Sequence, residues 1–185
     1  MHKQYEFAPL HTPRLTLRLF ERHDVDDVHA WMSHAETVRY MPFEPRSLDE
    51  VAERIAFFGS RHVVSLDGDS LDLAIELEGQ VIGTIHFVLT SVEHRSAEIG
   101  WALNSEFVGR GYAREAAAAM IDEAFGPLGL HRVFAQLDPR NAASIALCVR
   151  LGMRAEAHHV EHIWLKGEWA DTAIYGLLAR EWPAE

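Results

Sequence analysis

The sequence has little cysteine, little positive charge and no long apolar run, and each scarcity excludes a class of protein. Its 185 residues include one cysteine, which rules out an internal disulfide and a cysteine-rich zinc site. Lysine and arginine number 17 against 28 aspartates and glutamates, so nucleic-acid binding is not expected as the main role. No stretch reaches the roughly 18 apolar residues of a membrane helix, and Met1–Glu6 contains no apolar signal core. We therefore expect a cytoplasmic protein without a membrane partner.

The composition that is present is that of a globular protein. Hydrophobic residues make up 48% of the chain and charged residues 24%, a balance that argues against disorder and coiled coil. Strand-like and helix-like segments alternate without a repeat, a linker or a low-complexity tract. The sequence thus predicts one α+β domain in which strands and helices are mixed around one sheet.

Hydrophobic spacing and turn residues indicate where the elements lie. Ser47 and Glu50 have the spacing of a capping box, so a helix is expected to begin there. Glu78–Gln80 is typical of the turn in a β-hairpin. Apolar residues recur at offsets of three and four over 113–125, the clearest helical pattern in the chain. Asn141 is expected to cap a further helix.

A glycine-containing loop, Val108–Arg114, lies where a strand is expected to lead into the helix over 113–125. The first turn of a helix leaves about four backbone N–H groups without internal partners, and the helix dipole places partial positive charge there. Gly109 and Gly111 would let a diphosphate approach this backbone, and Arg110 and Arg114 add two full positive charges. The loop therefore predicts a phosphate-binding site, although Gly111 in an ordinary loop would also supply a positive φ.

Two common nucleotide-binding motifs are absent. The third glycine of the dinucleotide-binding fingerprint would fall at Arg114, and no Gly-x-x-x-x-Gly-Lys-Ser/Thr occurs. A Rossmann-type oxidoreductase and a P-loop nucleoside triphosphatase are therefore excluded.

The loop, its helix and the segment Asn141–Met153 resemble the acetyl-CoA-binding core of the GNAT superfamily of N-acetyltransferases. Thr12–Arg18, Ala97–Trp101 and Lys166–Asp171 resemble in particular the ribosomal-protein-alanine, or Rim-type, branch. The resemblance covers residues 12–182 and implies a single GNAT-like domain. Its expected fold is a mixed, mostly antiparallel sheet of about six to seven strands flanked by about four helices.

The resemblance implies a co-substrate, acetyl-CoA, and no metal. It assigns acetyl-CoA binding to Trp101, Ala102, Leu103, Val108, Gly109, Arg110, Gly111, Tyr112, Ala113, Arg114, Asn141 and Ser144. The chain departs from the superfamily pattern at two of its positions. Val108 stands where a glutamine or arginine is usual, and Cys148 stands where a tyrosine often lies near the thioester sulfur. The first change leaves the backbone donors intact, whereas the second puts the usual general acid in doubt.

Three residues are candidates for catalysis. Strand alternation places Glu98 in mid-strand on the face of Gly100 and Ala102, so its carboxylate is our candidate base for the incoming amine, with a structural ion pair as the alternative. Ser144 is a candidate acid or cofactor contact, or a plain helix serine. Cys148 lies seven residues after the helix cap, where a thiol could replace the tyrosine; a buried, inert cysteine is the alternative.

The histidines suggest a different function. His158–His162 matches the His-x-x-Glu-His pattern of a class of zinc peptidases. The surrounding alternation predicts a strand, on which His158 and His162 would lie about 13 Å apart and on the face opposite to His159 and Glu161. Such a separation does not allow one zinc ion to be shared, so no metal site is expected.

The leading hypothesis is transfer of acetyl from acetyl-CoA to a primary amine by direct attack in a ternary complex. The acceptor could be a protein N-terminus, a polyamine, an amino acid or an aminoglycoside, and the protein a monomer or a homodimer. Apolar residues expected to cover the acceptor, or to belong to the core, are Trp31, Met32, Tyr40, Met41 and Phe43, and Asp171 and Tyr175 are expected to shape its pocket. Alternatives are an acyltransferase that uses a longer donor such as succinyl-CoA, and a CoA-binding regulatory module without catalysis.

Overall fold

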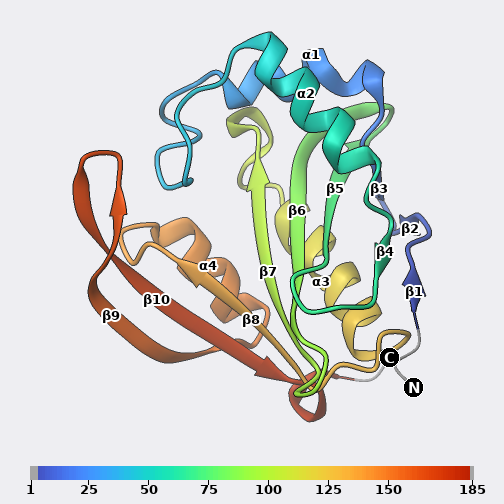
Figure 1. The fold of residues 1–185 in the computed structure, drawn as a ribbon, viewed down its shortest axis with the longest axis vertical. Coiled ribbons are helices and arrows are strands. Elements are labelled where there is room, and N and C mark those ends of the chain that lie inside the picture. Colours follow the sequence, from blue (N-terminus) through green and yellow to red (C-terminus); the bar gives the residue numbers. More distant parts are fainter. Residues whose placement is uncertain (1–3, 184–185) are drawn as a thin grey trace.

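The computed structural model describes residues 4–183; Met1–Lys3, part of the segment without a signal core, lie outside the described residues. Strands are numbered in chain order (Figure 1). Their bounds are β1 Tyr5–Glu6, β2 Leu10–His11, β3 Thr16–Leu19, β4 Val63–Val64, β5 Ser70–Leu77, β6 Gln80–Ser91, β7 Ser96–Leu103, β8 Arg132–Leu137, β9 Arg154–Leu165 and β10 Glu168–Leu178. No helix within residues 4–183 is long and apolar enough to cross a membrane.

Along the chain, the helices lie between these strands or, in one case, after the last strand. The α-helices are α1 Val25–Met32, α2 Leu48–Gly59, α3 Tyr112–Phe125 and α4 Ala142–Arg150, and the 3-10 helices are η1 Arg22–Asp24, η2 Ser105–Phe107 and η3 Ala179–Glu181. Figure 1 shows α1 and α2 together at one end of the molecule and the β9–β10 hairpin at its side. The expected α+β fold with helices around one mixed sheet is confirmed.

Eight strands form the main sheet, in the order β2-β3-β5-β6-β7-β8-β10-β9. This is slightly more than the six or seven expected, and the two-residue strand β2 lies at one edge. All neighbours are antiparallel except β7 and β8, which pair in parallel from Ser96 opposite Arg132 to Glu98 opposite Phe134. Beyond Glu98 the two strands diverge and leave a V-shaped opening in the sheet (Figure 1).

The local signals in the sequence produce the expected elements. Ser47 caps α2 by accepting a hydrogen bond from the N–H of Glu50, whose carboxylate in turn accepts one from the N–H of Ser47. Asn141 caps α4 because its side-chain oxygen accepts a hydrogen bond from the N–H of Ser144. Gly79 has a φ of +85° in the turn between β5 and β6, a conformation that glycine adopts without strain.

Two apolar clusters lie on opposite faces of the sheet. The larger one joins the sheet to α3 and α4, and includes Ile99, Met120 and Cys148. The smaller one joins it to α1 and α2, and includes Trp31 and Ala102. Because side chains alternate along β7, Ile99, Trp101 and Leu103 belong to the first face and Ala102 to the second. The separation of β7 and β8 therefore opens a passage between the two faces.

Candidate active site

The loop before α3 has the backbone that its glycines predict. Gly109 and Gly111 both have a φ of +84°, in the left-handed region, and Gly111 is the N-cap of α3. A side chain at either position would strain the backbone. The loop reverses direction through these two residues, so that the first turn of α3 faces the opening between β7 and β8.

The backbone N–H groups of this turn have no partners within residues 4–183. The N–H of Glu115 donates to the carbonyl of Gly111 across 3.1 Å, whereas the N–H groups of residues 109–114 make no hydrogen bond among the described residues. Together with the positive end of the helix dipole, these donors form a site suited to a phosphate or diphosphate.

Arg14 supports the loop from the N-terminal segment. Its guanidinium donates to the carbonyl of Arg110 across 3.1 Å, forms an ion pair of 2.6 Å with Glu115 and lies 4.4 Å from the ring centre of Tyr112. Thr12 also donates to Glu115, across 2.6 Å. The sequence motif Thr12–Arg18 contributed only to the family resemblance, and nothing in it indicated this contact with a loop about 100 residues away.

A cavity of about 500 Å³ lies in front of these N–H groups, between the diverging strands. Eleven of the twelve residues predicted to bind acetyl-CoA line it: Trp101, Ala102, Leu103, Val108, Gly109, Gly111, Tyr112, Ala113, Arg114, Asn141 and Ser144. The twelfth, Arg110, is exposed and does not line it. Residues that the sequence analysis did not single out for this cavity are Thr37, Ala143, Leu147 and Arg150.

A smaller cavity of about 140 Å³ adjoins the first. The two share five lining residues: Thr37, Met41, Trp101, Asn141 and Ser144. Ile99 and Gly100 of β7 and Gln136 of β8 also line the smaller one, so it occupies the start of the V. The two cavities together can hold a long carrier molecule in one and a second reactant in the other.

Glu98 lies beside the smaller cavity without lining it. Its carboxylate accepts a hydrogen bond of 2.9 Å from the side-chain amide of Gln136 and has no arginine or lysine within 4.0 Å among the described residues. The alternative of a structural ion pair is therefore wrong for Glu98. The carboxylate is half-buried, which leaves it accessible to a substrate or a water molecule.

Asn141 and Ser144 link α4 to both cavities. The side-chain oxygen of Asn141 accepts the N–H of Ser144 across 3.1 Å, which fixes the first turn of α4. Ser144 is half-buried and lines both cavities. The serine hydroxyl is therefore within the region where the two reactants would meet.

Cys148 lies elsewhere. It is fully buried in the larger apolar cluster and lines neither cavity. Burial raises the pKa of its thiol to about 12. Cys148 follows Ser144 by one turn of α4, but its thiol packs into the core, whereas Ser144 lines both cavities.

A second polar pair lies on the Glu98 face of the sheet. His86 of β6 is opposite Gly100 of β7, and its Nδ1 lies 2.7 Å from the carboxylate of Asp72 on β5. The hydrogen bond to Asp72 raises the pKa of His86; the charges of Asp72 and Glu98 also raise it, while burial and Arg54 oppose the change. The sequence alone does not indicate this pair, because the two residues meet only through strand pairing.

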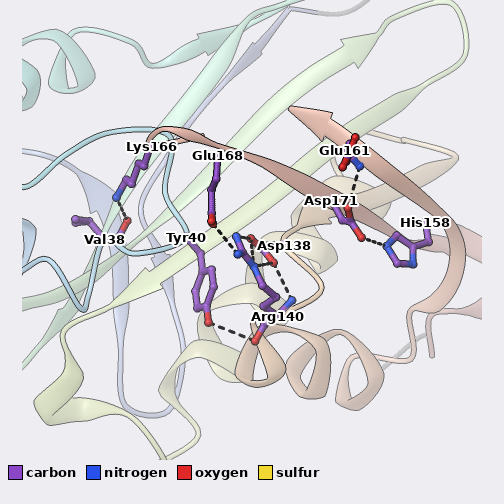
Figure 2. Close-up of polar contacts among 9 residues, drawn as sticks. All are labelled: Val38, Tyr40, Asp138, Arg140, His158, Glu161, Lys166, Glu168 and Asp171. Atoms are coloured by element: carbon purple, nitrogen blue, oxygen red, sulfur yellow. Dashed lines mark hydrogen bonds and ion pairs between the residues drawn. The ribbon is translucent and has the colours of Figure 1, made fainter. Parts of the chain in front are cut away.

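Thr37, Tyr40 and Met41 of the loop over 37–41 line the smaller cavity, and Val38 and Tyr40 of the same loop contact two distant segments (Figure 2). Lys166, in the β9–β10 turn, donates to the carbonyl of Val38 across 2.7 Å. The Tyr40 hydroxyl donates to the carbonyl of Arg140 across 3.4 Å, next to the α4 cap. The β9–β10 hairpin therefore helps to hold the loop over 37–41 beside the smaller cavity.

Arg140 itself is fixed by two acidic residues. Its guanidinium contacts Asp138 at 2.7 Å and Glu168 at 2.6 Å (Figure 2). Burial favours the neutral form of Asp138, but the hydrogen bonds from Arg140 outweigh it and lower the pKa of this carboxyl. The contact joins the end of β8 to β10, just before Asn141.

Tyr40 and Met41 line the smaller cavity, and their place near the acceptor stays a prediction. Trp31 and Met32 instead belong to the core under α1 and α2. Tyr175 packs against the larger cluster. Asp171 accepts from the N–H of Glu161 and contacts His158 at 2.7 Å (Figure 2). Asp171 and Tyr175 line neither of these two cavities, so the structure does not bring them together with Tyr40 and Met41, and their role in the acceptor pocket stays a prediction.

The His158–His162 segment forms part of β9, as predicted, but with a bulge. Glu161 has a φ of +48°, and the pairing register with β10 shifts next to it. The shift brings the rings of His159 and His162 to 5.0 Å, so the prediction that these two residues point to opposite faces is wrong. Within the described residues, no three His, Cys, Asp or Glu side chains gather in an arrangement that could hold a metal ion.

Comparison with known proteins identifies the family. The model of the acetyltransferase (GNAT) domain matches residues 14–154. The uncharacterized N-acetyltransferase p20 of Bacillus licheniformis is 32% identical, over 94% of this chain and 97% of its own. A GNAT-family acetyltransferase from Bacillus anthracis superposes with a TM-score of 0.84 at 28% identity, covering 94% of this chain and 100% of the other.

A third relative has been solved with ligands. The spermidine N-acetyltransferase of Vibrio cholerae, in complex with CoA and spermine, has a TM-score of 0.75 and 25% identity, covering 92% of this chain and 98% of its own. The family match over residues 14–154 and the likeness to p20 over nearly its full length agree with the fold. The chain therefore belongs to the GNAT family and is an acetyl-CoA-dependent N-acetyltransferase.

Proposed function

We propose that the protein, as one catalytic domain over residues 12–182, acetylates a primary amine by direct attack on acetyl-CoA in a ternary complex. The observation that carries this proposal is a row of N–H groups at 109–114 that have no hydrogen-bond partner within residues 4–183 and lie in front of a cavity of about 500 Å³, which adjoins a second cavity. The pyrophosphate of the donor would lie on these N–H groups. The pantetheine arm would follow Trp101–Leu103, whose backbone has no strand partner on the β8 side among the described residues.

The reaction has one bond to form and one to break. The nitrogen of the amine attacks the thioester carbon, and the carbon–sulfur bond breaks to release CoA as a thiolate. An amine with a pKa of about 8 to 10 arrives mostly as ammonium, so two protons leave its nitrogen in total. One of the two is transferred to a base and the other to solvent or to the thiolate.

Glu98 is the proposed base. Its carboxylate is half-buried beside the cavity where the amine would enter, and the bond from Gln136 orients it. A carboxylate in this position also attracts the cationic form of the substrate before the proton leaves. Proton transfer occurs directly or through one water molecule.

Ser144 is the proposed contact at the thioester end, because it lines both cavities. Its hydroxyl can donate to the leaving thiolate. A thiol has a pKa of about 8.5, so the thiolate leaves without obligatory protonation. The role of Ser144 is therefore smaller than that of Glu98, and Cys148 has none in this proposal because it is buried in the core.

The acceptor class rests on likeness to relatives. The Vibrio cholerae relative was solved with spermine, a small polyamine, and the Rim-type motifs resemble enzymes that acetylate a protein N-terminus. Both acceptors present a primary or α-amino group, and this shared group is what the proposed site acts on. We propose a protein N-terminus or a small amine as the acceptor class.

The test is an acceptor screen with two donors. Purified protein is supplied with acetyl-CoA or succinyl-CoA and a panel of amines, thiol release is followed in solution, and products are identified by mass spectrometry. We expect acetyl transfer to at least one amine and little transfer of succinyl. Tight CoA binding without turnover of any amine in the panel would contradict the proposal and favour a regulatory CoA-binding module.

A further inference from the structure

Two arginines on the acceptor side of the sheet share one aromatic ring. Arg46 precedes α2 and Arg54 lies within it, and both are half-buried. The guanidinium carbons of Arg46 and Arg54 lie 4.5 Å and 5.7 Å from the ring centre of Phe43. Arg54 also lies 4.6 Å from the ring centre of Phe58. Such cation–π contacts hold the two positive charges close together.

Neither arginine has an anionic partner within residues 4–183, where no carboxylate lies within 4.0 Å of it. The Nε atom of each is buried without a hydrogen-bond acceptor, and Trp31 Nε1 is the third and last such atom in the described chain. Burial and the charge of Arg46 both lower the pKa of Arg54. Two adjacent cations with buried, unpaired donors are costly, and an anion placed between them would remove that cost.

The pair lies on the same side of the sheet as the proposed base. Arg54 is near enough to Asp72 and His86 to take part in their electrostatics, and His86 is also influenced by Glu98. Asp72 does not neutralise Arg54, because Arg54 is more than 4.0 Å away and a carboxylate oxygen of Asp72 is bonded to His86. Phe43 packs on the cluster that contains Ala102 of β7, next to the cleft.

We propose that Arg46 and Arg54 bind an anionic group of the acceptor, a carboxylate or a phosphate, while its amine is directed to Glu98. The inference rests on the proposed function and specifies its acceptor as an amine that also carries negative charge. Planar guanidinium groups suit both anions, because each can donate two parallel hydrogen bonds. A polyamine has only positive charges, so the arginines would repel it.

The test compares acceptors that differ only in charge. The pairs are amino acids and their α-carboxamides, phosphoethanolamine and ethanolamine, and peptides with an acidic or an amide side chain after the N-terminal alanine; spermidine is assayed alongside. We expect the anionic member of at least one pair to have a kcat/KM about tenfold higher or more. The pair that responds distinguishes a carboxylate from a phosphate. Equal kcat/KM values in every pair, or a preference for spermidine, would overturn the inference while leaving amine acetylation intact.

Variants connect the preference to the two arginines. Arg46→Gln and Arg54→Gln should raise the KM for the anionic acceptor about tenfold or more, with the KM for acetyl-CoA unchanged. Arg46→Lys and Arg54→Lys keep the positive charge, so they show whether a loss of activity comes from misfolding. We expect these variants to have a KM for the anionic acceptor between those of the wild type and the glutamine variants. Arg61→Gln is the matched control, because Arg61 also lies over a phenylalanine, Phe57, at 5.2 Å, but outside this cluster. An unchanged KM in both glutamine variants would refute the role of the pair.

A measurement without turnover separates this inference from the proposed function. The Nε–H signals of the arginines are followed by NMR in protein saturated with CoA, while inorganic phosphate or acetate is added. We expect the Arg46 and Arg54 signals to shift with saturation and the Arg61 signal to remain. Absence of a shift with both anions would count against the anion site even if no acceptor in the panel were turned over.

Discussion

Gln136 donates a hydrogen bond to the carboxylate of Glu98 across 2.9 Å, and this bond spans the point where β7 and β8 separate. Backbone pairing between the two strands ends at Glu98 and Phe134, two residues before Gln136 on β8. The side-chain bond thus continues the connection of the strands into the cleft. It fixes the carboxylate at the entrance of the smaller cavity, where the amine is proposed to react.

Glu98→Gln should reduce kcat about a hundredfold while leaving CoA affinity unchanged, because an amide keeps the bond to Gln136 but does not accept a proton from the amine. Steady-state kinetics and calorimetric titration of CoA measure the two quantities. A wild-type rate would remove Glu98 as the base.

Gly111→Val should weaken CoA binding about tenfold or more, since a β-branched side chain at the helix N-cap would intrude where a diphosphate meets the N–H groups. Isothermal titration with CoA is the measurement. Gly79→Val is the control, because Gly79 has nearly the same φ, +85°, in a hairpin turn that lines neither cavity. Equal CoA affinity in the two variants would argue against the phosphate site.

Arg14→Gln should raise the KM for acetyl-CoA several-fold with a smaller effect on kcat. The variant loses the ion pair with Glu115 and the bond to the carbonyl of Arg110, so the loop would be held less firmly in its binding conformation. Kinetics at varied acetyl-CoA measure the change, and Arg22→Gln in η1 is a surface control. An unaltered KM would show that the loop is rigid without this support.

Cys148→Ala should change kcat less than tenfold, because the thiol is enclosed in the core away from both cavities. Its main effect should be on stability, a loss of about 1 kcal/mol in the free energy of unfolding. Chemical denaturation and acetylation assays measure these separately. A rate loss of about a hundredfold, roughly 2.7 kcal/mol, would restore Cys148 as a catalytic group.

His86 should give the protein a pH-dependent stability. The Asp72 hydrogen bond raises its folded pKa above the unfolded value of about 6.5, with Glu98 adding to the rise and Arg54 opposing it. The contribution of protonated His86 to the free energy of unfolding is therefore fully present below a pH of about 6.5. This contribution is lost as the pH rises through the pKa of His86 in the folded protein. The free energy of unfolding of the wild type, measured relative to His86→Gln, should fall over that range. NMR titration should show a lower His86 pKa in Asp72→Asn, and an equal pKa would contradict the assignment.

The parts of the site that are local in sequence could be predicted. Gly109 and Gly111 adopt the positive φ that glycine favours, and Asn141 caps α4 through a residue three positions away. The loop and its helix follow from such short-range rules, whereas most of the cavity lining was expected only from the family resemblance. The family resemblance added the sheet, whose strand pairing is not encoded in any single segment.

The rest depends on contacts between distant segments. Arg14 meets a loop about 100 residues later, and His86 meets Asp72 only because β5 and β6 pair in one register. The face of His162 was predicted incorrectly because Glu161, a residue without a glycine's freedom, adopts a positive φ and interrupts the alternation of β9. Composition and periodicity carry no information on these pairings.

The divergence of β7 from β8 also bears on how such an enzyme can be retargeted. In the part of the chain that the structure describes, residues 99–103 have no paired residue on β8, and their peptide groups are the same whatever side chains the chain carries. If the thioester donor binds to this main chain as proposed, the residues on the opposite face are free to vary. Exchange of side chains around α2 and the 37–46 loop, the proposed acceptor side, would then change the acceptor without changing how the donor binds.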